Sequence, residues 1–493
     1  MREDPLIPRE RVHDPKTRIY LSMRRAAIIG AGPNGLSAAI TLAQAGIAGT
    51  VYEAAATPGG AVRTAQLTLP GFHHDVGASV FPLGIASPFF RSLPLERFGL
   101  RWCHPAAAVA TPLPDGSAAM LENNVATTAA ALGEDASAWR RLMDPLVDHW
   151  DELCAELLQP LAHLPRHPLL LARFGLPALL PAAAFAKMLF RGQRARALFA
   201  GCAAHSAMPL SSPGSAAFGL MMAAAGQAVG WPIVEGGAQT LTDALATYLT
   251  NLSCDIRTNV RISDLSEIAD ANAVLCDLSP QGLLRIADQR MPHWYKGTLR
   301  RFQHGPGTFK VDWALSQPIP WRSPDCARAA TVHVCGTMEE IAAAEDAPRH
   351  GKVAARPFVL VTQPSLFDPT RAPEGRHTAW AYCHAPYGWE GSATEAIETQ
   401  IERFAPGFRD CILARHTMGP AEFEAWDANL IGGDISGGAM SLNQMLHRPT
   451  LSAYSTGTKG LYLCSASTPP GGGVHGMCGH LAALRALRDL GKT

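Results

Sequence analysis

The sequence predicts an α/β fold in two domains, one built around a parallel sheet and the other from a mixed sheet and helices. The 493 residues exceed what one hydrophobic core usually holds. A short apolar strand near the start runs into a glycine-rich turn and a helix, and two distant stretches carry similar buried strands. The expected boundaries are 24–90, 226–290 and 431–493 for the first domain, 91–225 and 291–430 for the second, and 1–23 for an N-terminal extension.

The first predicted element is a strand over 26–29 that leads into the run GAGPNG and a helix. This is the G-x-G-x-x-G pattern in the strand, turn and helix context that it requires. Gly30 makes the tight turn, Gly32 lets the backbone approach a pyrophosphate, and Gly35 lets helix and strand pack closely. The N-terminus of the helix offers N–H groups to phosphate, so the segment predicts a dinucleotide site.

The second predicted strand, over 50–53, ends in an acid. Glu53 follows Gly30 at close to the ~20-residue spacing of a carboxylate that accepts hydrogen bonds from ribose hydroxyls. An acid at this place disfavours a 2′-phosphate. The expected ligand is therefore FAD or NAD and not NADP.

The segment after Glu53 separates FAD from NAD. Residues 57–64, TPGGAVRT, resemble the second glycine motif shared by amine oxidases, phytoene desaturases and the Rab escort fold, which lies beside the flavin end of FAD. Those families have Arg directly after the glycine pair, whereas here Ala61 follows and Arg63 comes two residues later. Residues 71–79, GFHHDVGAS, match the segment that passes the isoalloxazine ring in these families.

Two later stretches complete the predicted first domain. In the middle of the chain, a helix opening at 236–241 precedes strands over 256–260 and 273–277. Near the end, residues 460–476, GLYLCSASTPPGGGVHG, indicate a strand, a loop and a glycine-rich helix start. These glycines would direct backbone donors at the flavin pyrimidine edge, where negative charge develops on reduction.

The C-terminal motif indicates the branch that the chain resembles. Amine oxidases normally have Asp at the position of Ala466, whereas phytoene desaturases have a small residue followed by Thr, Pro and glycines, as here. From residue 24 onward, the chain resembles the phytoene-dehydrogenase-like FAD oxidoreductases, the group of pyridine nucleotide-disulphide oxidoreductase domain protein 2. This resemblance implies a Rossmann-like FAD-binding domain in which the backbone of Val260 holds the adenine. The cofactor-binding residues predicted from motif and resemblance together are Gly30, Gly32, Pro33, Asn34, Gly35, Glu53, Gly60, Arg63, Ala78, Ser79, Val260, Ala466, Gly473 and Val474.

Two histidines are candidates for acting on the reacting group. His475 lies inside the loop expected to face the flavin, where an imidazole near pH 7 can donate or accept a proton; the alternative is a loop histidine bonded to backbone. His384 stands at a strand end with Tyr382, where it would line the substrate cavity or serve a structural role. His333, between two valines, is expected to be structural.

Composition excludes several classes of protein. Lys and Arg together number 42, as do Asp and Glu, so no net field draws the chain to nucleic acid. The eleven cysteines contain no C-x-x-C pair, no metal-ligating cluster is apparent, and the first 22 residues lack an apolar signal region. These features predict a cytoplasmic protein, with Met23 as a candidate for the native start because the first strand follows it closely.

Residues 197–234 contain no Asp, Glu, Lys or Arg and are punctuated by Pro and Gly. We expect them to be a buried segment of the second domain that lines an apolar cavity. The alternative is a surface in peripheral contact with a membrane.

The predicted function is FAD-dependent hydride abstraction from an apolar small molecule, by desaturation, dehydrogenation or a related isomerisation. Because the chain has one complete dinucleotide fingerprint, reoxidation is expected to use a diffusible acceptor such as dioxygen or a quinone. Two alternatives remain: a flavin amine oxidase, and a non-catalytic Rab-escort-like lipid binder.

Overall fold

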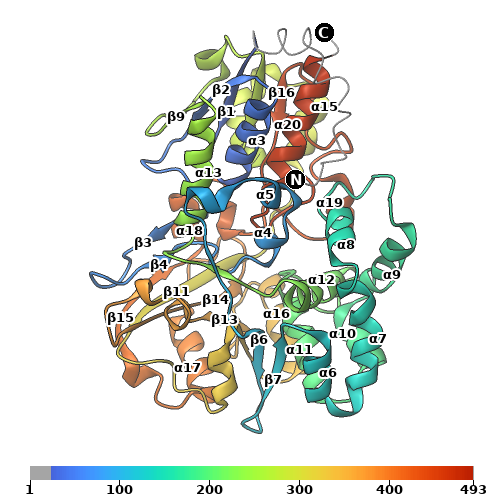
Figure 1. Ribbon diagram of the computed structural model, residues 1–493, viewed down its shortest axis with the longest axis vertical. Coiled ribbons are helices and arrows are strands. Elements are labelled where there is room, and N and C mark those ends of the chain that lie inside the picture. The colour runs from blue at the N-terminus through green and yellow to red at the C-terminus, as the bar shows by residue number, and fades with distance from the viewer. Residues whose placement is uncertain (1–23, 492–493) are drawn as a thin grey trace.

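A computed structural model describes residues 24–491 and contains two main sheets (Figure 1). The extension 1–23 and the candidate start Met23 lie outside the described residues. The upper sheet in Figure 1 is parallel and five-stranded, in the order β16-β10-β1-β2-β9. Its strands come from three stretches of the chain: β1 (Arg25–Ile29), β2 (Ala48–Tyr52), β9 (Asp255–Arg257), β10 (Ala273–Cys276) and β16 (Leu461–Leu463).

Helices cover both faces of the parallel sheet because alternate strand residues point to opposite sides. Ala26 and Ile28 pack toward α3 (Pro33–Gln44), α13 (Gln239–Asn251) and α20 (Met477–Leu490). Ala27 and Ile29 pack toward α14 (Pro280–Ala287) and α15 (His293–Arg300). Strands buried on both faces explain the apolar runs in the sequence.

The second sheet has seven strands in the order β15-β11-β14-β13-β12-β6-β7, and within it only β12 and β6 pair in parallel. One face packs against α17 (Thr394–Phe404), and α11, α12 and α16 contact the other side of the sheet. The strands are β6 (Ala107–Pro112), β7 (Ala118–Glu122), β11 (Gly307–Leu315), β12 (Ala329–Val334), β13 (Val359–Thr362), β14 (His377–Ala385) and β15 (Ile412–Met418).

A helical layer fills the side of the second domain at the right in Figure 1. Its helices are α6 (Val125–Ala131), α7 (Ala136–Val147), α8 (Trp150–Leu157), α9 (Pro168–Ala178), α10 (Ala182–Leu189), α11 (Gln193–Ala204), α12 (Ser215–Ala228) and α16 (Met338–Asp346). Shorter elements connect the domains: α4 (Pro82–Ala86), α5 (Pro88–Ser92), α18 (Pro420–Trp426), α19 (Leu442–His447), and the two-stranded pairs β3 (Thr64–Ala65) with β4 (His74–Asp75) and β5 (Trp102–Cys103) with β8 (Ile233–Val234).

Two predicted domain boundaries need correction. Tyr295 and Leu299 of α15 are buried in the core under the parallel sheet, so the boundary expected at residue 290 falls one helix too early. The boundary expected at residue 226 cuts through α12, a continuous helix of the second domain. Gly226 lies inside α12 and Pro292 lies directly before α15, so the glycine or proline near each predicted position did not mark the real boundary.

A buried ion pair joins the chain segments at the domain junction. Arg371 Nη2 lies 2.7 Å from Asp75 Oδ2, and both side chains are 1% exposed. Asp75 Oδ1 accepts hydrogen bonds from Thr64 Oγ1 and the Ala238 N–H, each at 2.8 Å. Arg371 Nε also donates to the His73 carbonyl at 3.2 Å. One carboxylate therefore connects the first segment, the middle segment and the second domain.

The uncharged stretch 197–234 forms most of α11, all of α12 and β8, and nearly all of its large apolar side chains are buried. These elements belong to the main hydrophobic core. The membrane-surface alternative for this stretch is therefore wrong, because its apolar side chains are already covered by the protein. The exposed leucines of this region lie before it, between 161 and 188.

Candidate nucleotide site and substrate cavity

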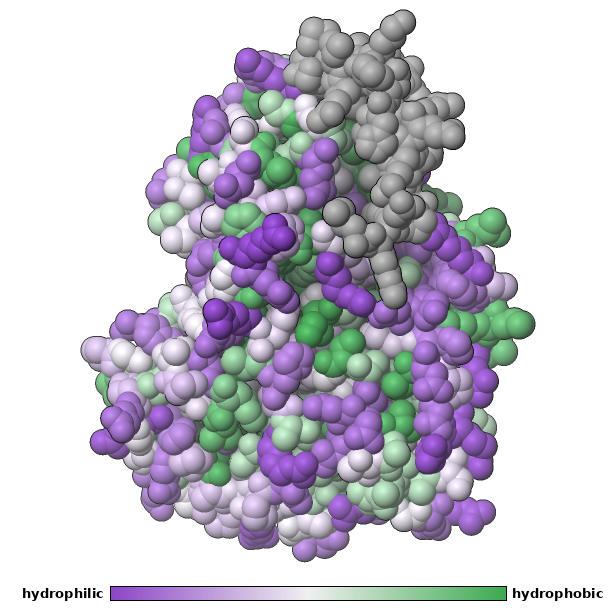
Figure 2. Space-filling view, in the orientation of Figure 1, coloured by the Kyte–Doolittle hydropathy of each residue, from purple (hydrophilic) through white to green (hydrophobic). Residues whose placement is uncertain are grey.

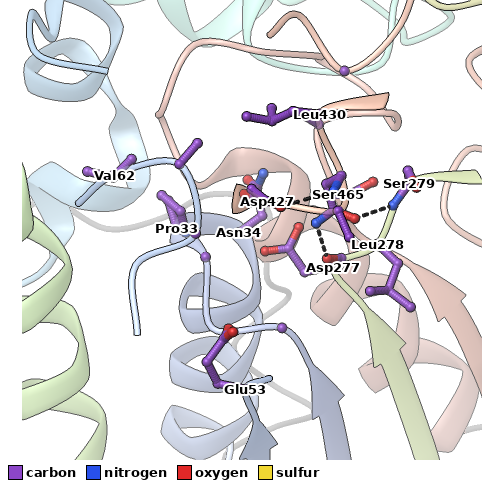
Figure 3. Close-up of a pocket in the computed structure, with 18 of the residues that line it drawn as sticks. Pro33, Asn34, Glu53, Val62, Asp277, Leu278, Ser279, Asp427, Leu430 and Ser465 are labelled. Carbon is purple, nitrogen blue, oxygen red and sulfur yellow. Dashed lines mark hydrogen bonds between the residues drawn. The ribbon is translucent and has the colours of Figure 1, made fainter. Parts of the chain in front are cut away.

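A pocket of about 410 Å³ lies at the carboxyl ends of β1, β2 and β10, where Gly30, Glu53 and Asp277 follow the strands (Figure 3). This is the edge at which open parallel sheets bind ligands. Most predicted cofactor residues line it: Gly30, Gly32, Pro33, Asn34, Glu53, Gly60, Arg63, Val260, Ala466, Gly473 and Val474, and the candidate His475 joins them.

The glycine turn has no room for side chains. A Cβ at Gly35 would lie 2.0 Å from the Gly30 carbonyl oxygen, which shows how closely the helix packs on the strand. A Cβ at Gly32 would lie 2.8 Å from Asp277 Oδ2. Gly35 does not line the pocket but supports it, because its N–H donates to Asp277 Oδ2 at 2.9 Å. The turn therefore fits a ligand that approaches backbone, such as a pyrophosphate.

Glu53 fixes the turn from the end of β2. Its Oε2 accepts from the Ala31 N–H at 2.7 Å, and its Oε1 accepts from the Ala55 N–H at 2.8 Å. Both oxygens retain further lone pairs for ribose hydroxyls. The carboxylate thus shapes the glycine loop as well as bordering the pocket.

Two further carboxylates, Asp277 and Asp427, border the same pocket (Figure 3). Burial, helped by the charges of Asp427 and Glu53 and opposed by the hydrogen bond from the Gly35 N–H, raises the pKa of Asp277 to about 7. Asn429 ties the 425–430 loop to this edge: its Oδ1 accepts from the Ser279 N–H at 2.7 Å and its Nδ2 donates to the Asp277 carbonyl at 3.0 Å. The second domain thus contributes a loop to the nucleotide pocket.

The raised pKa of Asp277 predicts pH-dependent cofactor binding. A bound diphosphate would favour the protonated carboxyl, so binding takes up a proton and affinity should fall by up to about tenfold per pH unit above pH 7. Asp277→Asn keeps an acceptor for Gly35 and should bind with affinity independent of pH over the same range. Titrating the apoprotein with FAD by flavin fluorescence from pH 6 to pH 9 checks this. Parallel curves for both proteins would contradict the assignment.

Arg63 is held by the protein at the pocket wall. Its Nε donates to the Gly60 carbonyl at 2.9 Å, its Nη2 donates to the Trp426 carbonyl at 3.3 Å, and the guanidinium lies 4.3 Å from the Trp426 ring centre. Burial lowers its pKa, opposed by Asp427 and Glu53. The two-residue offset from the usual position thus still brings the guanidinium to the pocket.

Backbone groups at two of the predicted cofactor positions already form hydrogen bonds within the protein. The Val260 N–H donates to the Glu53 carbonyl at 2.9 Å, which leaves its carbonyl as the group free to hold an adenine. The Ala466 carbonyl accepts from Arg448 Nη2 at 3.0 Å, and the same nitrogen donates to the Ser436 carbonyl at 2.9 Å. The buried Arg448 therefore holds the C-terminal loop against the 436 segment.

His475 is buried at the start of α20. Its Nδ1 accepts from the Met477 N–H at 3.1 Å, and its carbonyl accepts from Ser87 Oγ at 2.6 Å. Burial lowers the pKa of His475 to about 4, although the Gly471 and Gly472 carbonyls favour the protonated form. The imidazole is neutral at pH 7, with its proton on Nε2, an atom that has no partner of good hydrogen-bond geometry among the described residues. A neutral imidazole with an unpartnered Nε2–H favours a hydrogen-bond donor role for His475 over a general-acid role.

A second cavity, of about 290 Å³, adjoins the first. Ala61, Leu430, Ile435, Gly472, Gly473 and Val474 line both spaces. The stretch 197–234 contributes His205, Phe218, Met221, Met222 and Trp231 to its walls. Ala78 and Ser79, which were predicted to bind the cofactor, line this cavity and not the nucleotide pocket. The Ser79 hydroxyl donates a hydrogen bond to Asp75 Oδ2.

One wall of this cavity is polar. Lys310 on β11 is 2% exposed, lies 2.5 Å from Asp312 Oδ1, and has its ammonium 5.4 Å from the Trp380 ring centre. Trp380 and Tyr382 on β14 stack with ring centres 5.8 Å apart. The Thr308 hydroxyl has no hydrogen-bond partner among the described residues. The cavity is thus apolar along α12 and polar along β11 and β14.

His384 is structural in its contacts. It is absent from the residues lining either space, and its Nδ1 lies 2.7 Å from Glu345 Oε2 on α16. Burial opposes the charged form, but Glu345 outweighs it and raises the pKa of His384. The structure does not support the predicted catalytic role for His384: Tyr382 lines the cavity, whereas His384, on the same face of β14, is paired with Glu345 of α16. His333 is also buried and lies 3.0 Å from His205 between their Nε2 atoms.

Comparison with known proteins agrees with this geometry. Residues 28–93 match the family model of the NAD(P)-binding Rossmann-like domain. The chain is 28% identical to pyridine nucleotide-disulfide oxidoreductase domain-containing protein 2 of Rattus norvegicus, over 94% of this chain and 93% of the relative. A hydroxyneurosporene desaturase of Cereibacter sphaeroides is 34% identical over 45% of this chain and 46% of its own length. The chain is an oxidoreductase, and about half of it is similar in sequence to carotenoid desaturases. The predicted resemblance is confirmed.

Solved structures share the fold of this chain. An oxidoreductase from Methanosarcina mazei aligns with a TM-score of 0.61 at 15% identity, over 94% of this chain and 100% of the other. A putrescine oxidase variant aligns with a TM-score of 0.61 at 19% identity, over 94% and 98% of the two chains. The predicted α/β fold class with its Rossmann-like domain is confirmed.

Proposed function

We propose that the chain binds FAD without a covalent bond and oxidises an apolar small molecule by hydride abstraction, through desaturation, dehydrogenation or a related isomerisation. The observation that supports this most directly is the shared wall of Gly472, Gly473 and Val474, which borders both the nucleotide pocket and the adjoining cavity. A cofactor that extends from the glycine turn to this wall would present its reactive end to the cavity. Dioxygen or a quinone would serve as the diffusible electron acceptor.

FAD would supply the hydride acceptor, and the protein would supply binding, orientation and exclusion of water. Gly30, Gly32 and the N-terminus of α3 would hold the pyrophosphate, and Glu53 the ribose. A Cβ at Gly473 would lie 2.8 Å from Leu83 Cδ1, so backbone and not side chain meets the ligand there. Phe218, Met221 and Met222 would orient an apolar substrate against this wall.

Anaerobic reduction of the purified protein tests the reaction type. Flavin bleaching is followed while apolar alkenes and, separately, primary amines are added in the absence of dioxygen. Bleaching by the alkenes or their saturated precursors supports the proposal. A fully FAD-loaded protein that no member of either panel reduces would favour the lipid-binding alternative.

Amine oxidation is the second candidate, and one observation favours it. The stacked rings of Trp380 and Tyr382 provide aromatic faces in the cavity, which attract ammonium groups. The ammonium of Lys310 already occupies the neighbourhood of the Trp380 face, which disfavours a second cation. Rapid bleaching by amines alone would establish this candidate instead.

His475→Ala should lower the rate of flavin reduction without loss of FAD. A neutral donor aimed at developing charge contributes about 1.5–3 kcal/mol, so the rate should fall about 10- to 150-fold. The pH profiles of variant and wild type should run parallel from pH 6 to pH 9, because the pKa of His475 is about 4. Anaerobic stopped-flow reduction measures both. An unchanged rate at full FAD occupancy would leave His475 a structural role only.

A further inference from the structure

An exposed apolar surface covers the outer side of α9, α10 and the loop before them. Its large side chains are at least half exposed: Leu161, Leu164, Leu169, Leu176, Leu179 and Met188. Hydrophobic side chains project from the edge of the molecule where Figure 1 labels α9 (Figure 2). We call these six residues the α9–α10 surface. Exposed apolar area of this kind usually marks an interaction site.

The two helices are apolar on both of their faces. Phe174 and Ala178 of α9 and Phe185 and Ala186 of α10 are buried in the main core. A helix at the surface of a soluble domain normally turns polar residues outward, whereas these helices present leucine and methionine. The inner faces account for the packing of the domain, so the outer face is available to an apolar partner.

A buried acid holds the loop in place. Glu156 Oε2 lies 2.5 Å from His163 Nε2, and its Oε1 accepts from the N–H groups of Arg166 and His167 at 2.8 and 3.0 Å. The Glu156 side chain is 2% exposed. The loop that carries Leu161 and Leu164 is therefore anchored to the domain, and the surface is formed without a partner.

The stretch of chain that carries this surface has charges of one sign. Residues 157–234 contain no Asp or Glu and six Lys or Arg, whereas the whole chain has no net charge. Arg166, Arg173, Lys187 and Arg191 are exposed beside the leucines. Lys187 lies 3.9 Å from Glu339, a long pairing between half-exposed side chains. A basic rim around exposed leucines complements an anionic phospholipid surface.

We propose that the α9–α10 surface docks the protein on an anionic bilayer, inserting its leucines at the headgroup boundary without crossing. Among the described residues no single helix is long and apolar enough to span a membrane, and α9 and α10 meet at 103°. A second copy of the chain fits less well, because a two-fold interface would bring the same basic residues together. Docking of this kind does not depend on the redox reaction.

Cosedimentation of the full chain with vesicles tests this docking. The protein should bind phosphatidylcholine vesicles that contain phosphatidylglycerol, bind pure phosphatidylcholine weakly, and dissociate as salt rises. Leu169→Gln/Leu176→Gln should lower the partition coefficient about tenfold or more. Arg166→Gln/Arg173→Gln should lower it about fivefold per charge on anionic vesicles alone. Leu413→Gln, at a 46% exposed leucine of β15, is the matched control and should bind like wild type.

Thermal unfolding confirms that each variant is folded before binding is compared. Absence of binding to anionic vesicles at low salt would overturn the proposal, as would equal binding by the double leucine variant. Sedimentation equilibrium supplies a further outcome. A dimer that Leu169→Gln/Leu176→Gln dissociates would show that a second copy covers this surface, which also contradicts docking on lipid.

Discussion

Arg371→Met should lower the free energy of unfolding by about 3–5 kcal/mol, because removing one partner of a buried ion pair leaves the other charge uncompensated. Asp75 and Arg371 are each 1% exposed. Asp75 would keep its bonds from Thr64 and Ala238 but lose the only cation in direct contact with it among the described residues. The loss should appear in the unfolding step that separates the domains. Urea denaturation followed by tryptophan fluorescence measures it.

Arg91→Met is the matched control. Arg91 Nη1 lies 2.6 Å from Asp151 Oδ1, but the two side chains are 50% and 56% exposed. Water replaces the lost partner there, so the cost should stay below about 1 kcal/mol. Equal losses in the two variants would show that the Asp75–Arg371 pair does not anchor the junction.

Glu53→Gln should weaken FAD binding about 10- to 150-fold, which corresponds to the ~1.5–3 kcal/mol of a charge-assisted hydrogen bond. The amide keeps one acceptor oxygen and turns an NH₂ group toward either the Ala31 or the Ala55 N–H. The variant therefore loses an acceptor for ribose and distorts the glycine turn. Titration of apoprotein with FAD, followed by quenching of flavin fluorescence, gives the dissociation constants.

Glu267→Gln is the control for this substitution in the same domain. Glu267 accepts from the Ser263 and Asp264 N–H groups at an exposed helix start and lies outside the pocket. Its FAD affinity should match that of wild type. If Glu53→Gln also binds like wild type, the carboxylate is not part of the cofactor site.

The glycine turn could be predicted because its constraints are local. Gly30, Gly32 and Gly35 stand within one turn between a strand and a helix, and the structure shows why larger residues would clash. The position of Glu53 at the end of β2 could be predicted because the length of α3 determines where β2 ends. The absence of charged residues also indicated that 197–234 is buried.

Long-range contacts could not be predicted in the same way. Asp427 and Asn429 reach the nucleotide pocket from about 150 residues beyond Asp277, and no spacing in the sequence marks such a contact. Lys310 lies on β11, and only the pairing of β11 with β14 brings it beside Trp380. A charged residue inside an apolar strand is the signal that could have identified it.

The roles of histidines depend on burial, which composition does not reveal. His475 was placed correctly in the loop near the pocket, but its pKa of about 4 follows from packing around α20. Tyr382 and His384 are two residues apart in the sequence, so both side chains are expected on the same face of β14. The structure instead pairs His384 with Glu345, because α16 covers that end of the strand.

The cofactor itself is the most direct test of the account. The full chain is purified without added flavin, saturated with FAD, desalted and heat-denatured, and the released compound is separated against FAD, FMN and NAD standards. We expect FAD at about one per chain, released without proteolysis because no covalent bond holds it. Release of FMN or NAD, or of nothing after saturation, would contradict the assignment of this pocket.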